Sequence, residues 1–81
     1  MSQQRRALVT GATGGLGMAL VPALIEAGYR VRATGRNLER ITVLNDMGVE
    51  VVPADLLQSN VLTKLCKEQN VVFHLAALSS P

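Results

Sequence analysis

The sequence predicts an α/β fold in which four parallel strands alternate with three helices. Short apolar runs alternate with longer segments whose apolar residues repeat at helical spacing, which is the pattern of successive β–α–β units. The last of the short runs, residues 71–76, is apolar almost throughout, as expected for a strand that is covered on both faces. A chain of 81 residues is expected to form at most one small domain.

The composition excludes several classes of protein. A hydrophobic fraction of 48% is too high for a disordered segment, and no apolar run approaches the ~18–20 residues that span a bilayer. The first residues lack the pattern of a signal peptide, and a net charge of +2 is too small for a typical nucleic-acid-binding protein. With one cysteine, Cys66, and one histidine, His74, neither an intrachain disulfide nor a metal site is expected. We therefore expect a cytoplasmic protein that binds neither nucleic acid nor membranes.

Each element is predicted from its local pattern. Strands are expected at residues 6–10, 29–34, 49–53 and 71–76, and helices at about 15–27, 38–47 and 60–69. In the first helix Leu16, Leu20 and Leu24 repeat at i, i+4 spacing. Gly28 then provides the stop signal that is typical of a helix C-terminus.

The segment Thr10-Gly11-Ala12-Thr13-Gly14-Gly15-Leu16-Gly17 connects the first strand to the first helix. Gly11 is expected to let the chain turn sharply, and Gly17 to let the helix pack near the sheet. Without Cβ atoms, Gly14 and Gly15 would allow the backbone to approach a pyrophosphate, which would face the free N–H groups and the positive dipole end of the helix. The alternative is a glycine-rich turn that binds no ligand.

This segment resembles the TGxxGxxG motif of the short-chain dehydrogenases/reductases, and most closely that of their extended branch, the NAD-dependent epimerase/dehydratase type. Three further segments are similar to the family in the same order, namely Gly35-Arg36-Asn37, Ala54-Asp55-Leu56 and Phe73-His74-Leu75-Ala76-Ala77. The resemblance covers essentially the whole chain. It implies a truncated Rossmann-type (doubly wound) parallel sheet with strand order 3-2-1-4, and a nicotinamide dinucleotide as the cofactor.

The resemblance also implies roles for particular residues. The pyrophosphate loop would consist of Gly11, Thr13, Gly14, Gly15, Leu16 and Gly17. The adenine amino group would be bound by Asp55, with the Leu56 backbone beside it, and the adenosine ribose would lie along Ala76 and Ala77. Two alternatives stay open here: Asp55 could instead cap a helix or turn, and the two alanines could serve only to pack the sheet.

The end of the second predicted strand indicates which dinucleotide is preferred. A carboxylate there, about twenty residues past the glycine loop, would bind the ribose 2′-hydroxyl group of NAD. This chain instead has Thr34, Gly35 and Arg36, and no acidic residue before Glu39. A guanidinium favours a 2′-phosphate through charge-assisted hydrogen bonds, so we predict NADP(H), with Arg36 as the main contact and Arg32 as a weaker one. NAD is the alternative, because an arginine can also stack on adenine.

The catalytic residues of the resembled family do not carry over to this chain. The family uses a tyrosine and a lysine four positions later, but here Tyr29 is followed by Ala33 at that distance. We expect His74 to point into a helix–sheet interface rather than act as a base, and Cys66 to be a small core residue.

The resemblance therefore implies the N-terminal, dinucleotide-binding part of a longer oxidoreductase, epimerase or dehydratase, which is not catalytic on its own. A small-molecule substrate would be bound by the longer protein. Two alternatives are a non-catalytic NADP(H)-sensing regulator with the same fold, and a self-associating half-domain with a vestigial nucleotide site.

The implied strand order places the fourth strand at one edge of the sheet. Residues 71–76 offer unpaired backbone groups and apolar side chains, and contain neither lysine nor proline. We therefore expect self-association, most simply a two-fold dimer in which two fourth strands pair antiparallel.

Overall fold

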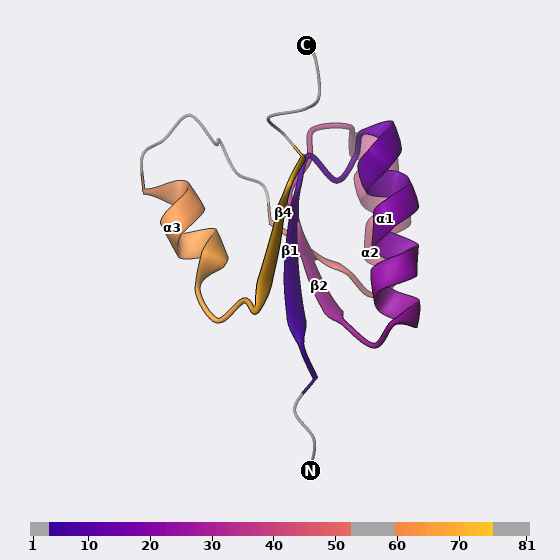
Figure 1. Cartoon of the computed structure of the whole chain (residues 1–81). Helices are drawn as coiled ribbons and strands as arrows, with labels where there is room; N and C mark the ends of the chain where they lie inside the picture. The colour runs from indigo at the N-terminus through magenta and orange to yellow at the C-terminus, as the bar shows by residue number, and fades with distance from the viewer. Residues whose placement is uncertain (1–3, 53–59, 76–81) are drawn as a thin grey trace.

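The computed structural model describes residues 4–52 and 60–75, and Figure 1 shows how strands and helices alternate within them. The strands are β1 (Arg6–Thr10), β2 (Arg30–Ala33), β3 (Glu50–Val51) and β4 (Val71–His74), and the helices are α1 (Gly15–Glu26), α2 (Leu38–Asp46) and α3 (Val61–Cys66). Every predicted element is present, and most are shorter than predicted at one or both ends. Among the described residues no helix is long and apolar enough to cross a membrane.

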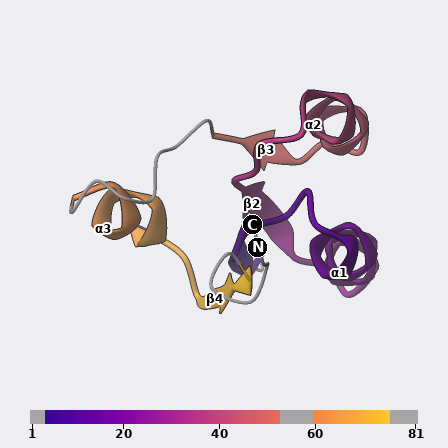
Figure 2. The same ribbon diagram turned by 90° about the horizontal axis from the view of Figure 1, so that it is seen from above.

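The four strands form one parallel sheet with the order β3-β2-β1-β4. Strand β1 is central, so that Ala7 lies opposite Val31 of β2 on one side and Val71 of β4 on the other. Seen from above, α1 and α2 lie on one face of the sheet and α3 lies on the opposite face (Figure 2). This arrangement confirms the predicted Rossmann-type sheet and its strand order.

The main hydrophobic core lies between the sheet and helices α1 and α2. Its buried members are Ala7, Val9, Ala12, Val21, Leu24, Val31, Ala33, Leu44 and Val49. Since side chains alternate along a strand, the intervening residues of β1 and β2 point toward α3. Leu8 is fully buried on that side, whereas Arg6, Arg30 and Arg32 make the same face strongly basic near the amino ends of the strands.

The prediction that His74 points into a helix–sheet interface is wrong. Its side chain is exposed, and its Nδ1 atom forms a 2.7 Å hydrogen bond with the Oγ1 atom of Thr10. The reason is that α3 is held beside β2, where Arg32 donates to the Leu65 carbonyl. The side chains of Val72 and His74, which share a face of β4, therefore remain exposed. Cys66 is half-buried.

Candidate nucleotide-binding site

The loop between β1 and α1 begins at the carboxyl end of the central strand. The chain leaves β1 toward α1 on one face of the sheet, whereas the neighbouring strand β4 is reached from α3 on the other face (Figure 2). Ligands of open parallel sheets bind in the crevice where successive connections lie on opposite faces. The glycine segment therefore occupies the usual ligand position of this fold.

Two glycines of the loop are required by the conformation of the protein itself. Gly11 has a φ of +67°, in the left-handed region that favours glycine. A Cβ atom on Gly17 would lie 2.5 Å from the Cα atom of Ala12, so any side chain there would push α1 away from the loop. Both observations agree with the turning and packing roles predicted from the sequence.

Gly14 and Gly15 are different, because neither conformation nor packing requires them to be glycine. Gly14 has φ −74° and ψ 169°, which any residue can adopt. A Cβ atom on Gly14 would meet nothing closer than the Gly11 carbonyl oxygen at 3.4 Å, and one on Gly15 would meet nothing within 4 Å. The missing side chains leave open space in front of the first turn of α1.

That first turn presents hydrogen-bond donors to the open space. The first hydrogen bond of the helix runs from the Met18 N–H to the Gly14 carbonyl. The N–H groups of residues 15–17 therefore have no carbonyl acceptor within the helix. Gly14 has no side chain with which to cap them, and the first turn contains no acidic residue. The site therefore combines donors that have no partner among residues 4–52 and 60–75 with the positive end of the helix dipole, which together suit an anion. Leu16 lies within this turn and is 61% exposed.

Thr13 connects this loop to the one that follows β2. Its buried Oγ1 atom accepts hydrogen bonds from the backbone N–H groups of Arg36 at 3.2 Å and Asn37 at 3.4 Å. Gly35 makes this contact possible, because a Cβ atom there would lie 2.4 Å from the Thr13 Cγ2 atom. The Thr13 hydroxyl thus positions the backbone of Arg36 next to the glycine loop.

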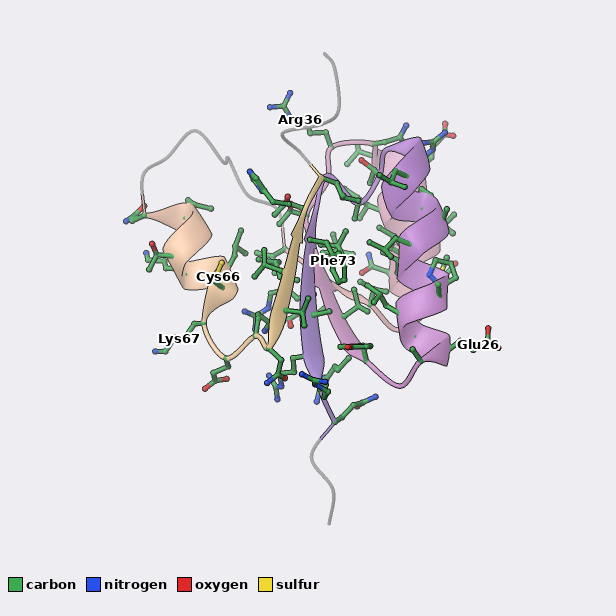
Figure 3. The ribbon with its side chains drawn as sticks, viewed as in Figure 1. Glu26, Arg36, Cys66, Lys67 and Phe73 are labelled. Atoms are coloured by element: carbon green, nitrogen blue, oxygen red, sulfur yellow. The ribbon has the colours of Figure 1, made fainter. Side chains whose placement is uncertain are left out.

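Two arginines lie at this corner of the sheet. Figure 3 shows Arg36 beyond the carboxyl ends of the strands, and its exposed guanidinium has no ion pair or hydrogen bond with any described residue. Arg40 was not singled out from the sequence; one of its guanidinium nitrogens donates to the Thr13 carbonyl at 2.7 Å. No local pattern in the sequence indicates this contact, because it joins residues 27 positions apart.

Arg32 does not belong to this corner. Its side chain lies on the α3 face, where it forms an ion pair with Glu50 at 3.1 Å and donates to the carbonyl oxygens of Leu65 and Lys67. The prediction of Arg32 as a weaker cofactor contact is therefore wrong, because alternation along β2 directs it toward α3. Four predicted site residues lie outside the described residues, namely Asp55, Leu56, Ala76 and Ala77.

The parallel sheet and the glycine loop define a Rossmann-type fold of the dinucleotide-binding class. Residues 3–80 match the NmrA-like family. The chain belongs to this family.

Individual relatives and solved structures agree with this assignment. The chain is 42% identical over 78 residues to the uncharacterized protein YbjS of Escherichia coli K12, covering 94% of this chain and 23% of that protein. It is 54% identical over 39 residues to a probable NADP-dependent dehydrogenase of Haemophilus influenzae, covering 48% of this chain and 16% of that one. The crystal structure of alfalfa vestitone reductase superimposes with a TM-score of 0.71 at 28% identity, covering 85% of this chain and 24% of the reductase. The chain thus spans less than a quarter of the length of these proteins.

Proposed function

We propose that this chain is the NADP(H)-binding part of an oxidoreductase of the extended short-chain dehydrogenase/reductase type. The observation that carries the proposal is the open space at Gly14 and Gly15, where the protein itself has no need of glycine. A pyrophosphate carries the negative charge and the acceptor oxygens that this space and the donors of residues 15–17 would accommodate. The loop residues Gly11, Thr13, Gly14, Gly15, Leu16 and Gly17 would hold it.

The preference for NADP(H) over NAD(H) rests on Arg36. Its guanidinium is unpaired among the described residues, and its backbone is fixed beside the glycine loop by Thr13. No carboxylate lies between the end of β2 and Glu39 in α2, so nothing there would repel a 2′-phosphate. A planar guanidinium binds such a phosphate through two parallel, charge-assisted hydrogen bonds. NAD(H) is the alternative cofactor.

The proposed reaction is hydride transfer in the whole protein. The dinucleotide, when bound, supplies the hydride chemistry, and the residues of this chain bind and orient it. Asp55 and Leu56 would contact the adenine, and Ala76 and Ala77 the ribose, as the family resemblance implies. The similarity to a probable dehydrogenase of Haemophilus influenzae and to a reductase of alfalfa supports an oxidoreductase, with an epimerase or dehydratase as the alternative.

Calorimetric titration of the chain with NADPH and NADH tests the proposal. Arg36→Ala should remove a charge-assisted contact worth about 1.5–3 kcal/mol, and so weaken NADPH binding by roughly 10–150-fold while NADH binding changes little. Gly14→Val should weaken the binding of both, because its methyl groups would occupy the pyrophosphate position. Arg5→Ala is the matched control, since Arg5 is exposed and precedes the amino end of β1.

Three outcomes would reject parts of the proposal. Equal affinities of the wild type and Gly14→Val would exclude the glycine loop as the binding site. Equal wild-type affinities for NADH and NADPH, or an unchanged ratio in Arg36→Ala, would exclude the preference for NADP(H).

The chain is also proposed to self-associate through the free edge of β4. This strand is the last of the sheet order and pairs only with β1 among the described strands. Val72, in its middle, is 42% exposed, and the strand carries neither lysine nor proline to block pairing. A second copy could pair antiparallel along the same strand in a two-fold dimer.

A further inference from the structure

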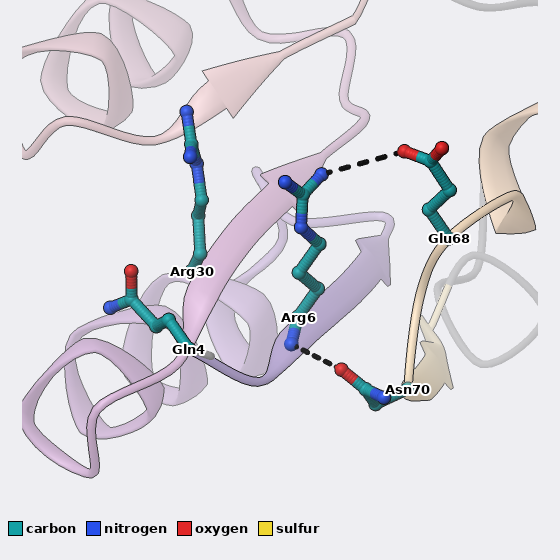
Figure 4. Close-up of a pocket in the computed structure, with 5 residues that line it drawn as sticks. All are labelled: Gln4, Arg6, Arg30, Glu68 and Asn70. Carbon is teal, nitrogen blue, oxygen red and sulfur yellow. Dashed lines mark hydrogen bonds and ion pairs between the residues drawn. The ribbon is translucent and has the colours of Figure 1, made fainter. Parts of the chain in front are cut away.

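A polar recess of about 530 Å³ opens at the amino ends of the strands, at the opposite end of the sheet from the glycine loop. Figure 4 shows the five side chains that line it, namely Gln4, Arg6, Arg30, Glu68 and Asn70. None of these residues has a role in the proposed dinucleotide site. The recess therefore requires its own explanation.

Two arginines stand side by side in the recess. Arg6 and Arg30 lie directly opposite each other in the β1–β2 pair, so their side chains leave the same face of the sheet from strands about 4.8 Å apart. Arg6 meets the Glu68 carboxylate at 3.8 Å, but the two side chains are 38% and 69% exposed, and a pair so open to solvent is weak. The exposed guanidinium of Arg30 has no hydrogen bond or ion pair with a described residue. Two positive charges thus face one negative charge.

The other side chains add donors to this positive charge. The Asn70 Oδ1 atom accepts a 2.7 Å hydrogen bond from the Arg6 backbone N–H, which leaves the Asn70 amide NH₂ group as a donor. The Gln4 side chain offers a second amide at the rim (Figure 4). Guanidinium and amide donors around a net positive charge suit an oxyanion, which accepts several hydrogen bonds at once.

Phosphate is the oxyanion that suits this arrangement best. Its tetrahedral group carries three acceptor oxygens, so it can accept hydrogen bonds from both guanidinium groups and from the Asn70 amide at once. A carboxylate group offers only two oxygens. We propose that this recess is a second anion site, which binds a free phosphate or the phosphate group of a small molecule.

Phosphate titration of the ¹⁵N-labelled chain, followed by NMR at constant ionic strength and pH, tests the proposal. The backbone N–H groups of Arg6 and Asn70 report on the recess, and those of Gly14 and Gly15 report separately on the glycine loop. We expect saturable shifts at Arg6 and Asn70 with inorganic phosphate, and none with chloride. Succinate should bind more weakly, and glycerol 3-phosphate should bind like free phosphate.

Three variants make the test specific. Arg30→Gln should abolish the shifts at the recess and leave those of the glycine loop. Arg5→Gln removes the same charge from a residue that does not line the recess, so it should leave both sets of shifts. Glu68→Gln removes the competing carboxylate and should tighten phosphate binding by about two- to fivefold.

The proposal is overturned if the recess signals do not move, if chloride moves them equally, or if Arg30→Gln leaves them unchanged. Tighter binding of succinate than of phosphate would overturn the assignment to phosphate. Because the glycine loop is observed in the same spectra, failure of this site is distinguishable from failure of the dinucleotide site.

Discussion

The guanidinium of Arg40 donates a 2.7 Å hydrogen bond to the backbone carbonyl of Thr13. On the other side of the same residue, the Thr13 hydroxyl accepts the N–H groups of Arg36 and Asn37. The glycine loop is therefore attached to the start of α2 through both the backbone and the side chain of one residue. Its shape depends on residues that follow β2 as well as on its own glycines.

We predict that Arg40→Ala weakens the binding of NADH and NADPH by the same factor. Loss of one hydrogen bond to a charged group on the surface is worth about 1 kcal/mol, or roughly fivefold in affinity, and it acts on the loop that both cofactors share. Calorimetry on Arg40→Ala beside Arg36→Ala separates the two roles. A loss confined to NADPH would show that Arg40 contacts the 2′-phosphate directly.

A second prediction concerns the stability of α1. Gly17→Ala places a methyl group within 2.7 Å of three backbone atoms of Ala12, and such overpacking should lower the free energy of unfolding by about 1–3 kcal/mol or more. Gly15→Ala adds the same methyl group to the same helix where nothing lies within 4 Å. It should be neutral or stabilising by up to about 1 kcal/mol. Urea denaturation followed by circular dichroism measures both, and equal effects would contradict the packing role of Gly17.

A third prediction concerns Glu68, which has a φ of +66°. A non-glycine residue in this left-handed region costs about 1–2 kcal/mol. A glycine removes this cost, but part of the gain is lost because glycine gives the unfolded chain more conformational entropy. Glu68→Gly should therefore raise the free energy of unfolding by about 0.5–1 kcal/mol. Glu68→Gln is the control, because it removes the charge and keeps the backbone penalty. If Gln stabilises as much as Gly, the effect is electrostatic and the backbone explanation is wrong.

The fourth prediction concerns the β4 edge. Light scattering at micromolar concentrations should detect a dimer of the wild-type chain, and Val72→Lys should shift it to monomer, because a lysine at the edge opposes strand pairing. Val43→Lys is the matched control: Val43 is similarly exposed, at 45%, but lies on α2 away from this edge. A monomeric wild type, or an equal effect of both lysines, would contradict association through β4.

The order and type of the elements could be predicted because each depends on residues that are close in sequence. The position at which α3 ends could not be predicted in this way. The helix ends at Cys66, Lys67 is already extended and Glu68 is left-handed, and the last carbonyls are bound by Arg32 from β2. A contact between residues so far apart in sequence has no local pattern.

The candidate site divides in the same way. The TGxxGxxG segment could be located because the fold requires glycine at positions 11 and 17, and this requirement is visible directly as a spacing in the sequence. The contact of Arg40 with Thr13 and the turning of Arg32 away from this site could not be predicted from the sequence. Both depend on which face of the sheet each helix covers, and the tertiary structure decides that. Arg32 in β2 and Arg40 in α2 are only eight positions apart and carry the same charge, but they bind unrelated partners.

The central position of β1 has a consequence for the order in which the molecule assembles. β1 pairs with β2 after a single helical connection, but its pairs with β4 join residues 64 positions apart, such as Thr10 and His74. Contacts between distant residues form more slowly, since a larger loop must close first. Strands β1 and β2 with α1 between them are thus expected to come together early. The glycine loop and the Thr13 contacts to Arg36 would then exist before β4 completes the sheet, so a nascent chain would form the proposed pyrophosphate-binding loop before the rest of the proposed site.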